Sequence, residues 1–146
     1  MKKLIIVIFF INILMLSCGT KEETRTEFII KNNSSHNAEL TVYDAQMPNQ
    51  NPKDVTFKLD NNSEISYYYV IEGENGPFND YPLGATADSA CVIFNDNLQI
   101  IYRNNDLNPR NILDISSWDE VIESDTYFKY IYIITNDDYN NAVEIE

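Results

Sequence analysis

Few residues in this chain could perform nucleophilic chemistry. The 146 residues include one histidine, His36, and two cysteines, Cys18 and Cys91. A nucleophile needs a base such as histidine within hydrogen-bond reach, and His36 lies in a polar segment that is predicted to be a turn. The G-x-S-x-G sequence of one large hydrolase class is absent. We therefore interpret His36 as a solvated turn residue, and Cys91, in the apolar run 90–94, as a buried and inert thiol.

Side-chain oxygens are abundant enough to consider a metal site or a pair of catalytic carboxylates. Residues 104–108 and 136–140 place such oxygens at alternate positions, but an EF-hand loop also needs glycine at its sixth position and glutamate at its twelfth. The first segment has Pro109 and Ile115 there, and we interpret both segments as turns. No histidines or cysteines have zinc-like spacing, so we predict no metal and no cofactor. Spacing alone cannot locate a glycosidase-like carboxylate pair, and a glycan-acting enzyme is kept as a lesser alternative.

Aromatic side chains offer one further chemistry, the stacking of sugar rings. Tyr67, Tyr68, Tyr69 and Trp118 could form a stacking platform for a glycan. Tyrosines are also common in strands, where the ring packs and the hydroxyl stays in contact with water, and this chain has ten of them. We therefore interpret these aromatic residues as packing residues.

The second cysteine, Cys18, closes a hydrophobic N-terminal stretch. Lys2 and Lys3 precede residues 4–16, which are apolar apart from Asn12. Thirteen such residues match the hydrophobic region of a secretory signal, whereas a membrane-spanning helix needs about 20. We predict that residues 1–17 are a signal peptide, and an uncleaved membrane span is the alternative.

Residues 14–18, Leu-Met-Leu-Ser-Cys, resemble the lipobox of bacterial lipoprotein signal peptides. In that family a small residue, here Ser17, precedes an invariant cysteine that receives a diacylglyceryl group, becomes the new N-terminus and is usually N-acylated. Met15 and Leu16 depart from the usual residues of the motif, and ordinary signal cleavage after Gly19 is the alternative. The resemblance implies a lipoprotein with a stable membrane anchor, because two or more acyl chains are buried.

Lys21, Glu22 and Glu23 resemble the surface-export signal of Bacteroidetes lipoproteins, which directs a protein to the outer face of the outer membrane. The resemblance implies an outer-membrane location, at the cell surface or, without export, at the periplasmic face. A solvated tether is the alternative, because residues 21–26 are polar and charged. We accordingly predict a lipidated tether over residues 18–26 and a single domain over residues 27–146.

By composition, that domain is strongly acidic. The whole chain has a net charge of −13, and loss of Lys2 and Lys3 leaves eight basic residues against 23 acidic ones, a net charge of −15. Without a basic patch the domain is not expected to bind nucleic acid, whereas a basic protein would be attracted. Residues 18–146 are long enough to bury a core, and with Cys18 lipidated no intrachain disulfide can form.

Alternation of apolar and polar residues with period two predicts about seven short strands, at residues 27–31, 38–43, 55–59, 65–71, 90–94, 98–103 and 126–134. The third and fourth look like a hairpin, and the fifth and sixth like another with the three-residue loop 95–97. Ser117 with Glu120 predicts a capping box for one helical turn. Thr135 with Asp138 predicts another for a turn over residues 136–142.

This series of strands and turns predicts an all-β fold. The favoured architecture is an antiparallel β-sandwich, immunoglobulin-like in the broad sense, and a small β-barrel is the alternative. Residues 72–89 form the longest irregular segment and hold three of the four glycines. Because long irregular loops are often functional, we predict that ligands contact this loop.

Two segments of the last 60 residues resemble the small lipoproteins of Bacteroidetes. Residues 87–96 contain the predicted strand 90–94 with its phenylalanine, and a T-x-x-D-Y-x-x-A pattern follows at Thr135, Asp138, Tyr139 and Ala142. The resemblance implies a β-rich domain and brings no known activity. Residues 88–90, Asp-Ser-Ala, also resemble the O-glycosylation motif of Bacteroidetes, which makes Ser89 a candidate glycosylation site.

These features predict a non-catalytic binding module that is anchored by lipid at the outer membrane and binds a protein or a glycan. The alternative is an acidic inhibitor or immunity-type lipoprotein that binds a basic enzyme, because a net charge of −15 would steer it toward a cationic surface.

Overall fold

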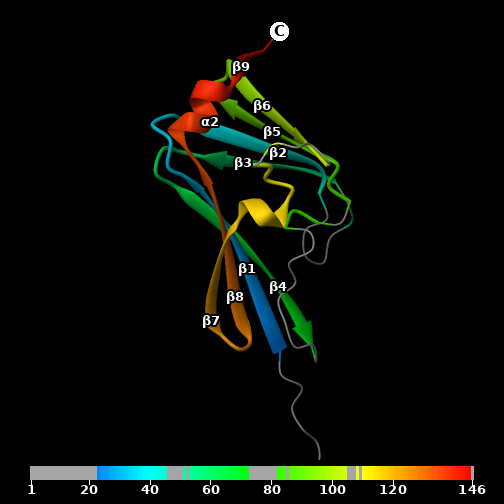
Figure 1. The fold of residues 1–146 in the computed structure, drawn as a ribbon. Coiled ribbons are helices and arrows are strands. Elements are labelled where there is room, and N and C mark those ends of the chain that lie inside the picture. Colours follow the sequence, from blue (N-terminus) through cyan, green and yellow to red (C-terminus); the bar gives the residue numbers. More distant parts are fainter. Residues whose placement is uncertain are drawn as a thin grey trace, which may run out of the picture.

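The computed structural model describes residues 23–45, 51, 53–72, 82–84, 86–104, 108 and 110–145. In this part of the chain two β-sheets pack against each other as a sandwich (Figure 1). The predicted all-β sandwich is therefore confirmed.

One sheet has four strands in the order β4-β1-β8-β7, and the other has five in the order β3-β2-β5-β6-β9. The strands are β1 Glu23–Asn32, β2 Ala38–Ala45, β3 Lys53–Leu59, β4 Glu64–Glu72, β5 Ser89–Phe94, β6 Leu98–Arg103, β7 Asp119–Ser124, β8 Tyr127–Ile134 and β9 Val143–Glu144. The helical elements are a 3₁₀ turn, η1 Ile115–Ser117, and one short α-helix, α2 Asn136–Asn141. No helix in these described ranges is long and apolar enough to cross a membrane.

The pairing differs from an all-antiparallel sandwich at one place. β1 and β8 run parallel, with Arg25 opposite Tyr127 and Asn32 opposite Ile134. Period-two alternation identifies strands and their faces, but it carries no information about the direction of the partner strand. The parallel pair therefore lay outside what the sequence could predict.

β1 also begins earlier than predicted. Thr24 and Thr26 are each only 1% exposed, and the strand pairs with β4 from Glu23 onward. Residues 23–26 thus belong to the folded domain, and the prediction that they form part of a tether is wrong. The start of the strand was missed because residues 23–26 show no alternation of apolar and polar side chains, although Thr24 and Thr26 face the core.

The core lies between the two sheets and is rich in aromatic rings. Phe28 on β1 contacts Tyr130 on β8 and Trp118, with ring centroids 5.5 and 5.6 Å away. The Trp118 indole is 6% exposed and donates a hydrogen bond to the carbonyl of Ile112 at 3.0 Å. The segment before β7 is therefore fastened to the inside of the sandwich by one buried, hydrogen-bonded ring.

The predicted capping box at Ser117 and Glu120 is wrong. The helical turn lies earlier, at η1, where the Asp114 carboxylate accepts a hydrogen bond from the Ser116 amide at 2.9 Å. Glu120 instead belongs to β7, which pairs with β8. By contrast, the capping box that Thr135 and Asp138 were predicted to form is present at the start of α2.

The long axis of β1 separates two ends of the molecule. Figure 1 shows the first residues of β1 at one end of the molecule and α2 and β9 at the other. Ten residues in a strand span about 30 Å. The turn that follows β1, residues 33–37, therefore lies about 30 Å from Glu23.

Candidate functional site

Three turns meet at one end of the five-stranded sheet and enclose a hollow. β2 is antiparallel to both β3 and β5, so the first residue of β2, Ala38, lies opposite Leu59 near the end of β3 and Phe94 at the end of β5. The turns that precede β2 and follow β3 and β5 are thereby brought together. The hollow has a volume of about 400 Å³ and is lined by Asn37, Ala38, Glu39, Lys58, Leu59, Asp60, Ile93, Asn95 and Asp96.

The lining combines an apolar part with an acidic one. Ala38 and Leu59 are almost fully buried. Three carboxylates, those of Glu39, Asp60 and Asp96, accompany one basic side chain, Lys58, whose Nζ lies 3.7 Å from Glu39. This arrangement can receive a cationic group on an aliphatic stem, which would contact the carboxylates with its head and the half-buried Ile93 with its stem.

The turn beside the hollow is held by a buried asparagine, Asn32. Its amide nitrogen lies 2.8, 3.0 and 3.2 Å from the carbonyl oxygens of His36, Leu59 and Asp60. Its side-chain oxygen accepts hydrogen bonds from the amide and the hydroxyl of Ser34. Asn32 is 0% exposed, its bonds to Leu59 and Ser34 are buried, and together these bonds fix the β1–β2 turn against the end of β3.

His36 lies beside the hollow in a half-buried position. Its ring stacks on Tyr139 of α2 with centroids 3.6 Å apart and an interplanar angle of 14°. The side-chain nitrogen of Asn95 lies 2.9 Å from Nδ1 of His36, and because an amide nitrogen can only donate, Nδ1 is the acceptor. The prediction of a turn position is confirmed, but the ring is covered by Tyr139 rather than freely solvated.

Cys91 contacts a different set of residues. It lies on the outer face of β5, with its Sγ 3.7 Å from Oε1 of Gln99. The residue is 6% exposed, and burial raises the pKa of the Cys91 thiol, which keeps it in the less reactive protonated form. Its prediction as a buried thiol is confirmed, and His36 and Cys91 are not brought together as a catalytic pair.

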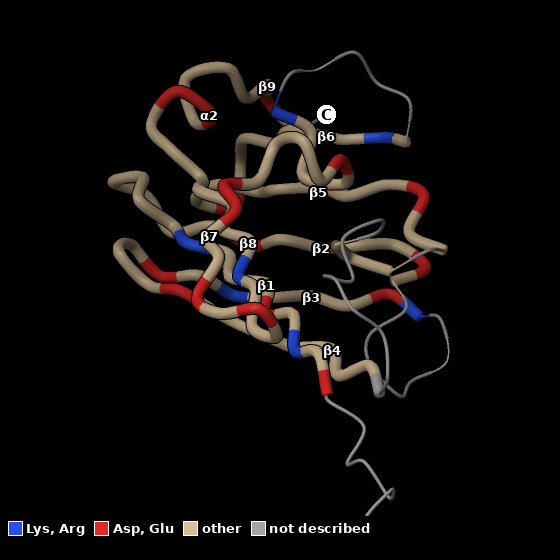
Figure 2. The backbone as a smooth tube through the Cα atoms, turned by 60° about the horizontal axis from the view of Figure 1, so that its bottom comes forward, with Lys and Arg blue, Asp and Glu red and all other residues tan. Residues whose placement is uncertain are grey.

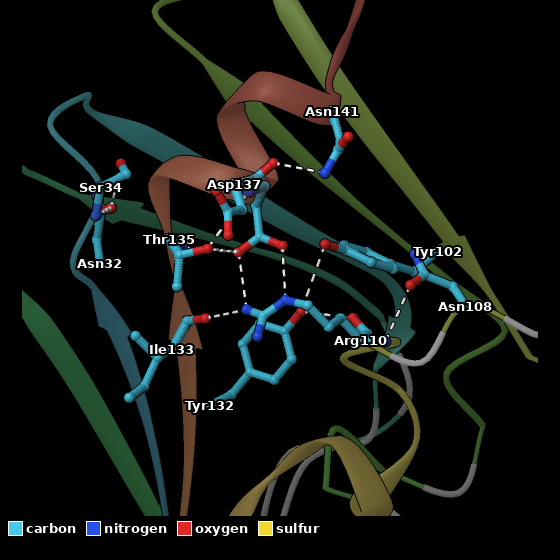
Figure 3. A network of polar contacts seen from close by, with 11 residues as sticks. Asn32, Ser34, Tyr102, Asn108, Arg110, Tyr132, Ile133, Thr135, Asp137 and Asn141 are labelled. Carbon is cyan, nitrogen blue, oxygen red and sulfur yellow. Dashed lines mark hydrogen bonds and ion pairs between the residues drawn. The ribbon is translucent and has the colours of Figure 1, made fainter.

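An ion pair locks α2 onto the loop before η1 (Figure 3). Arg110 donates from Nε and Nη2 to the two oxygens of Asp138, at 3.0 and 2.9 Å, and from Nη2 to the carbonyl of Ile133 at 2.5 Å. The same Asp138 carboxylate accepts from the amide and hydroxyl of Thr135 at 2.7 and 2.9 Å. The network positions α2, and with it the Tyr139 ring that covers His36.

Two buried tyrosines extend this network into the core. The Tyr132 hydroxyl donates to the carbonyl of Arg110 at 2.7 Å and lies 3.5 Å from the hydroxyl of Tyr102. Burial raises the pKa of Tyr102 to about 12 and that of Tyr132 well above its usual range. Both hydroxyls therefore stay protonated and act as structural hydrogen-bonding groups.

The predicted sugar-stacking aromatic residues do not form a platform. Successive strand residues point to opposite faces, so Tyr67 and Tyr69 contact Phe28 of the core while Tyr68 points outward. Trp118 is buried in the core. Our interpretation of these aromatic residues as packing residues is confirmed for three of the four, and Tyr68 lies 52% exposed over Arg25.

The predicted anchor lies outside the described residues. Cys18, Lys21 and Glu22 precede them, and Glu23 is the first residue of β1, opposite Glu72. Most of the predicted ligand-binding loop, residues 73–81 and 85, also lies outside. Ser89 begins β5, and its hydroxyl donates to the Asp88 carboxylate at 2.7 Å.

The described part of the chain provides no metal centre. No three histidine, cysteine, aspartate or glutamate side chains are grouped there as metal ligands. Of the two segments with alternating oxygens, residues 136–140 lie in α2, and residues 105–107 of the other lie outside the description. Each buried side-chain nitrogen or oxygen in this part has a hydrogen-bond partner.

The sequence predicts that the turns around the hollow exist, but it does not predict that they lie next to one another. Polar clusters at 32–37, 60–63 and 95–97 mark turns. Their approach depends on the pairing of β2 with β5, strands that are not neighbours along the chain.

Comparison with known proteins adds no relative: no family model, no curated protein and no solved structure matches the chain.

Proposed function

We propose that this protein is a lipid-anchored binding module of the outer membrane, attached through Cys18, that presents the hollow at the far end of its sandwich to a protein ligand. One observation carries the proposal: the hollow borders the turn that follows β1, at the opposite end of that strand from Glu23. An anchor attached just before Glu23 would therefore leave the hollow facing away from the membrane.

The distances support this arrangement. Five residue steps separate Cys18 from Glu23, and an extended chain covers at most about 18 Å in that length. β1 adds about 30 Å between Glu23 and the turn beside the hollow. The hollow would stand about 30 to 50 Å above the lipid headgroups, within reach of a soluble or cell-surface protein.

The chemistry of the hollow favours a basic ligand. Asp60 and Asp96 contribute to its polar lining, and the half-buried Ile93 provides its apolar part. A net charge of −15 after loss of residues 1–17 would raise the association rate of a cationic protein and make it dependent on salt. This favours the second candidate function, an inhibitor or immunity-type lipoprotein for a basic enzyme, over glycan binding.

The anchor is tested by fractionation and protease shaving of intact cells that carry an epitope-tagged chain. We expect the wild type in the outer-membrane fraction and Cys18→Ala released from it. Cleavage by added protease on intact cells would place the domain on the cell surface, whereas protection would place it in the periplasm. Identical fractionation of Cys18→Ala and the wild type would contradict the anchor.

The ligand is tested with a panel of purified basic lytic enzymes on immobilised protein at low and raised salt. Asp60→Asn with Asp96→Asn removes two charges from the hollow, and asparagine tolerates the positive φ of 65° at position 96. Asp119→Asn with Asp125→Asn removes the same charge from the β7 region. We expect the first pair, and not the second, to lower retention at least tenfold. Equal loss in both pairs would mean that net charge, and not the hollow, binds the enzyme.

A further inference from the structure

Basic residues are sparse on this fold, as Figure 2 shows, yet one of them contributes an ammonium group to the acidic hollow. Nζ of Lys58 lies 3.7 Å from Oε2 of Glu39. In the described part of the chain, neither Asp60 nor Asp96 takes part in an ion pair. Three carboxylates against one ammonium group leave the hollow with a net charge of −2. The hollow therefore holds one cation from its own chain and has charge left for another.

Glu39 lies in the middle of a row of three side chains on the outer face of the five-stranded sheet. Lys58 of β3 is opposite Glu39 of β2, and Glu39 is in turn opposite Ile93 of β5. Directly opposite side chains in antiparallel strands have Cβ atoms about 4.5–5.5 Å apart. Glu39 thus has an ammonium group on one side and the half-buried, apolar Ile93 on the other. A second cation can approach the Glu39 carboxylate from the Ile93 side, with an aliphatic stem that lies on Ile93.

The ion pair between Lys58 and Glu39 is weak. Its atoms are 3.7 Å apart, whereas those of the other three ion pairs among the described residues are 3.0, 2.9 and 2.8 Å apart. The Lys58 side chain is 84% exposed and that of Glu39 is 39% exposed, so water screens the attraction between them. Pairs exposed to this extent favour the paired arrangement by about fivefold at most. A ligand can therefore displace Lys58 from Glu39 at little cost.

We propose that Lys58 occupies the hollow as a competitor of the ligand, and that the group it stands in for is the side chain of a lysine on the partner protein. The ligand lysine lies on Ile93, directs its ammonium group to Glu39 and displaces Lys58 into solvent. The inference rests on the proposed function, because it names the part of the basic ligand that enters the same hollow. Lys58 itself shows that an ammonium group at the end of a four-carbon stem can approach Glu39.

An ammonium group suits this lining better than a guanidinium group. The three carboxylates come from three different elements: β2, the turn after β3 and the turn after β5. The three donors of an ammonium group can turn toward acceptors on different sides, whereas the planar guanidinium matches the two oxygens of one carboxylate. The pair of Arg110 and Asp138, in which Nε and Nη2 each donate to one carboxylate oxygen, shows that second arrangement elsewhere in the fold.

The test is an NMR titration, at constant ionic strength, of residues 18–146 with Cys18→Ser, which include the whole described core. The probe is Nα-acetyl-lysine N-methylamide, added to about 50 mM. Its norleucine analogue has the same stem without the ammonium group, and its arginine analogue carries a guanidinium group instead. We expect the lysine probe to shift the amide signals of Glu39 and Ile93 and to bind at least fivefold more strongly than either analogue. No binding of the lysine probe in this range, or equal or stronger binding of either analogue, would overturn the proposal.

Matched variants separate competition from net charge. Lys58→Ala removes the competitor, and Lys53→Ala removes the same charge from an exposed position on the same strand that does not line the hollow. We expect Lys58→Ala to bind the lysine probe about three- to fivefold more strongly than the wild type, and Lys53→Ala to change the affinity less than about 1.5-fold. In Glu39→Gln the probe should bind at least fivefold more weakly, and adding Lys58→Ala should then change the affinity less than twofold. Equal affinities of Lys58→Ala and the wild type, or equal gains in both lysine variants, would overturn the proposal.

These outcomes are separate from those of the basic-enzyme panel. If the enzymes are retained through the hollow but Lys58→Ala leaves the affinity for the lysine probe unchanged, the proposed function stands and the competition is refuted. If the probe binds with the expected effects of the variants but no basic enzyme is retained, the competition stands and the inhibitor function is refuted.

Discussion

Replacing Arg110 by alanine tests whether the Arg110–Asp138 pair holds α2 in place. The change removes two hydrogen bonds to Asp138 and one to the carbonyl of Ile133. It leaves the Asp138 carboxylate, whose side chain is 7% exposed, with the two hydrogen bonds from Thr135. Arg110→Ala therefore leaves a buried carboxylate without its ion-pair partner but with two of its hydrogen bonds.

The expected loss of stability follows from how exposed Arg110 and Asp138 are. Breaking a fully buried ion pair costs about 3–5 kcal/mol, and an exposed pair contributes less than about 1 kcal/mol. The Arg110 side chain is 45% exposed, so solvent screens its half of the interaction. We expect the free energy of unfolding to fall by about 2 kcal/mol in Arg110→Ala. Arg110→Lys should lose about half of that, because an ammonium group cannot bind both carboxylate oxygens in the same planar geometry.

Urea unfolding followed by the fluorescence of Trp118 measures this difference. Its indole is buried and lies 5.5 Å from the Tyr132 ring, so its emission reports loss of the core beside Arg110. Lys58→Ala is the control, because Lys58 and Glu39 are 84% and 39% exposed and their atoms lie 3.7 Å apart. A loss below about 0.5 kcal/mol in Arg110→Ala, equal to that of the control, would refute the reasoning.

Three further predictions concern buried polar groups. Asn32→Ala should lower the free energy of unfolding by about 2–4 kcal/mol in urea, because it leaves the buried Leu59 carbonyl and the hydroxyl and amide of Ser34 without their partner, whereas the exposed Asn33→Ala should be neutral within about 0.5 kcal/mol. Because burial raises the pKa of Tyr102 to about 12, its contribution to stability is complete below pH 10. It should fall by about 1.4 kcal/mol per pH unit from pH 10 to about 12, visible as tyrosinate absorbance that appears together with unfolding. Cys91 should react with a thiol reagent at pH 8 at least tenfold more slowly in the folded protein than in urea; equal rates would contradict its burial.

Strand positions and the sandwich could be predicted because they depend on local alternation. The hairpin of β5 and β6 has the predicted three-residue loop, with Phe94 opposite Leu98. The capping box of α2 was predictable for the same reason, since Thr135 and Asp138 are three residues apart in sequence. Each of these features is decided by residues that are close together along the chain.

Features that depend on non-local pairing could not be predicted. β7, whose six residues are all exposed, shows no apolar alternation, and it exists because β8 pairs with it. The hollow depends on β2 lying between β3 and β5. Local sequence patterns predict the polar turns and the apolar run of β5, but they do not predict which of these segments become neighbours in the fold.

The parallel pair of β1 and β8 has a consequence for the order in which the molecule is made. Arg25 lies opposite Tyr127, a partner about a hundred residues later, so the central pair of the four-stranded sheet has a very large loop to close. During synthesis, β1 must wait until residues 127–134 have emerged, and until then β4 is the neighbour available to it. The first strand of the domain is thus among the last to complete its pairing.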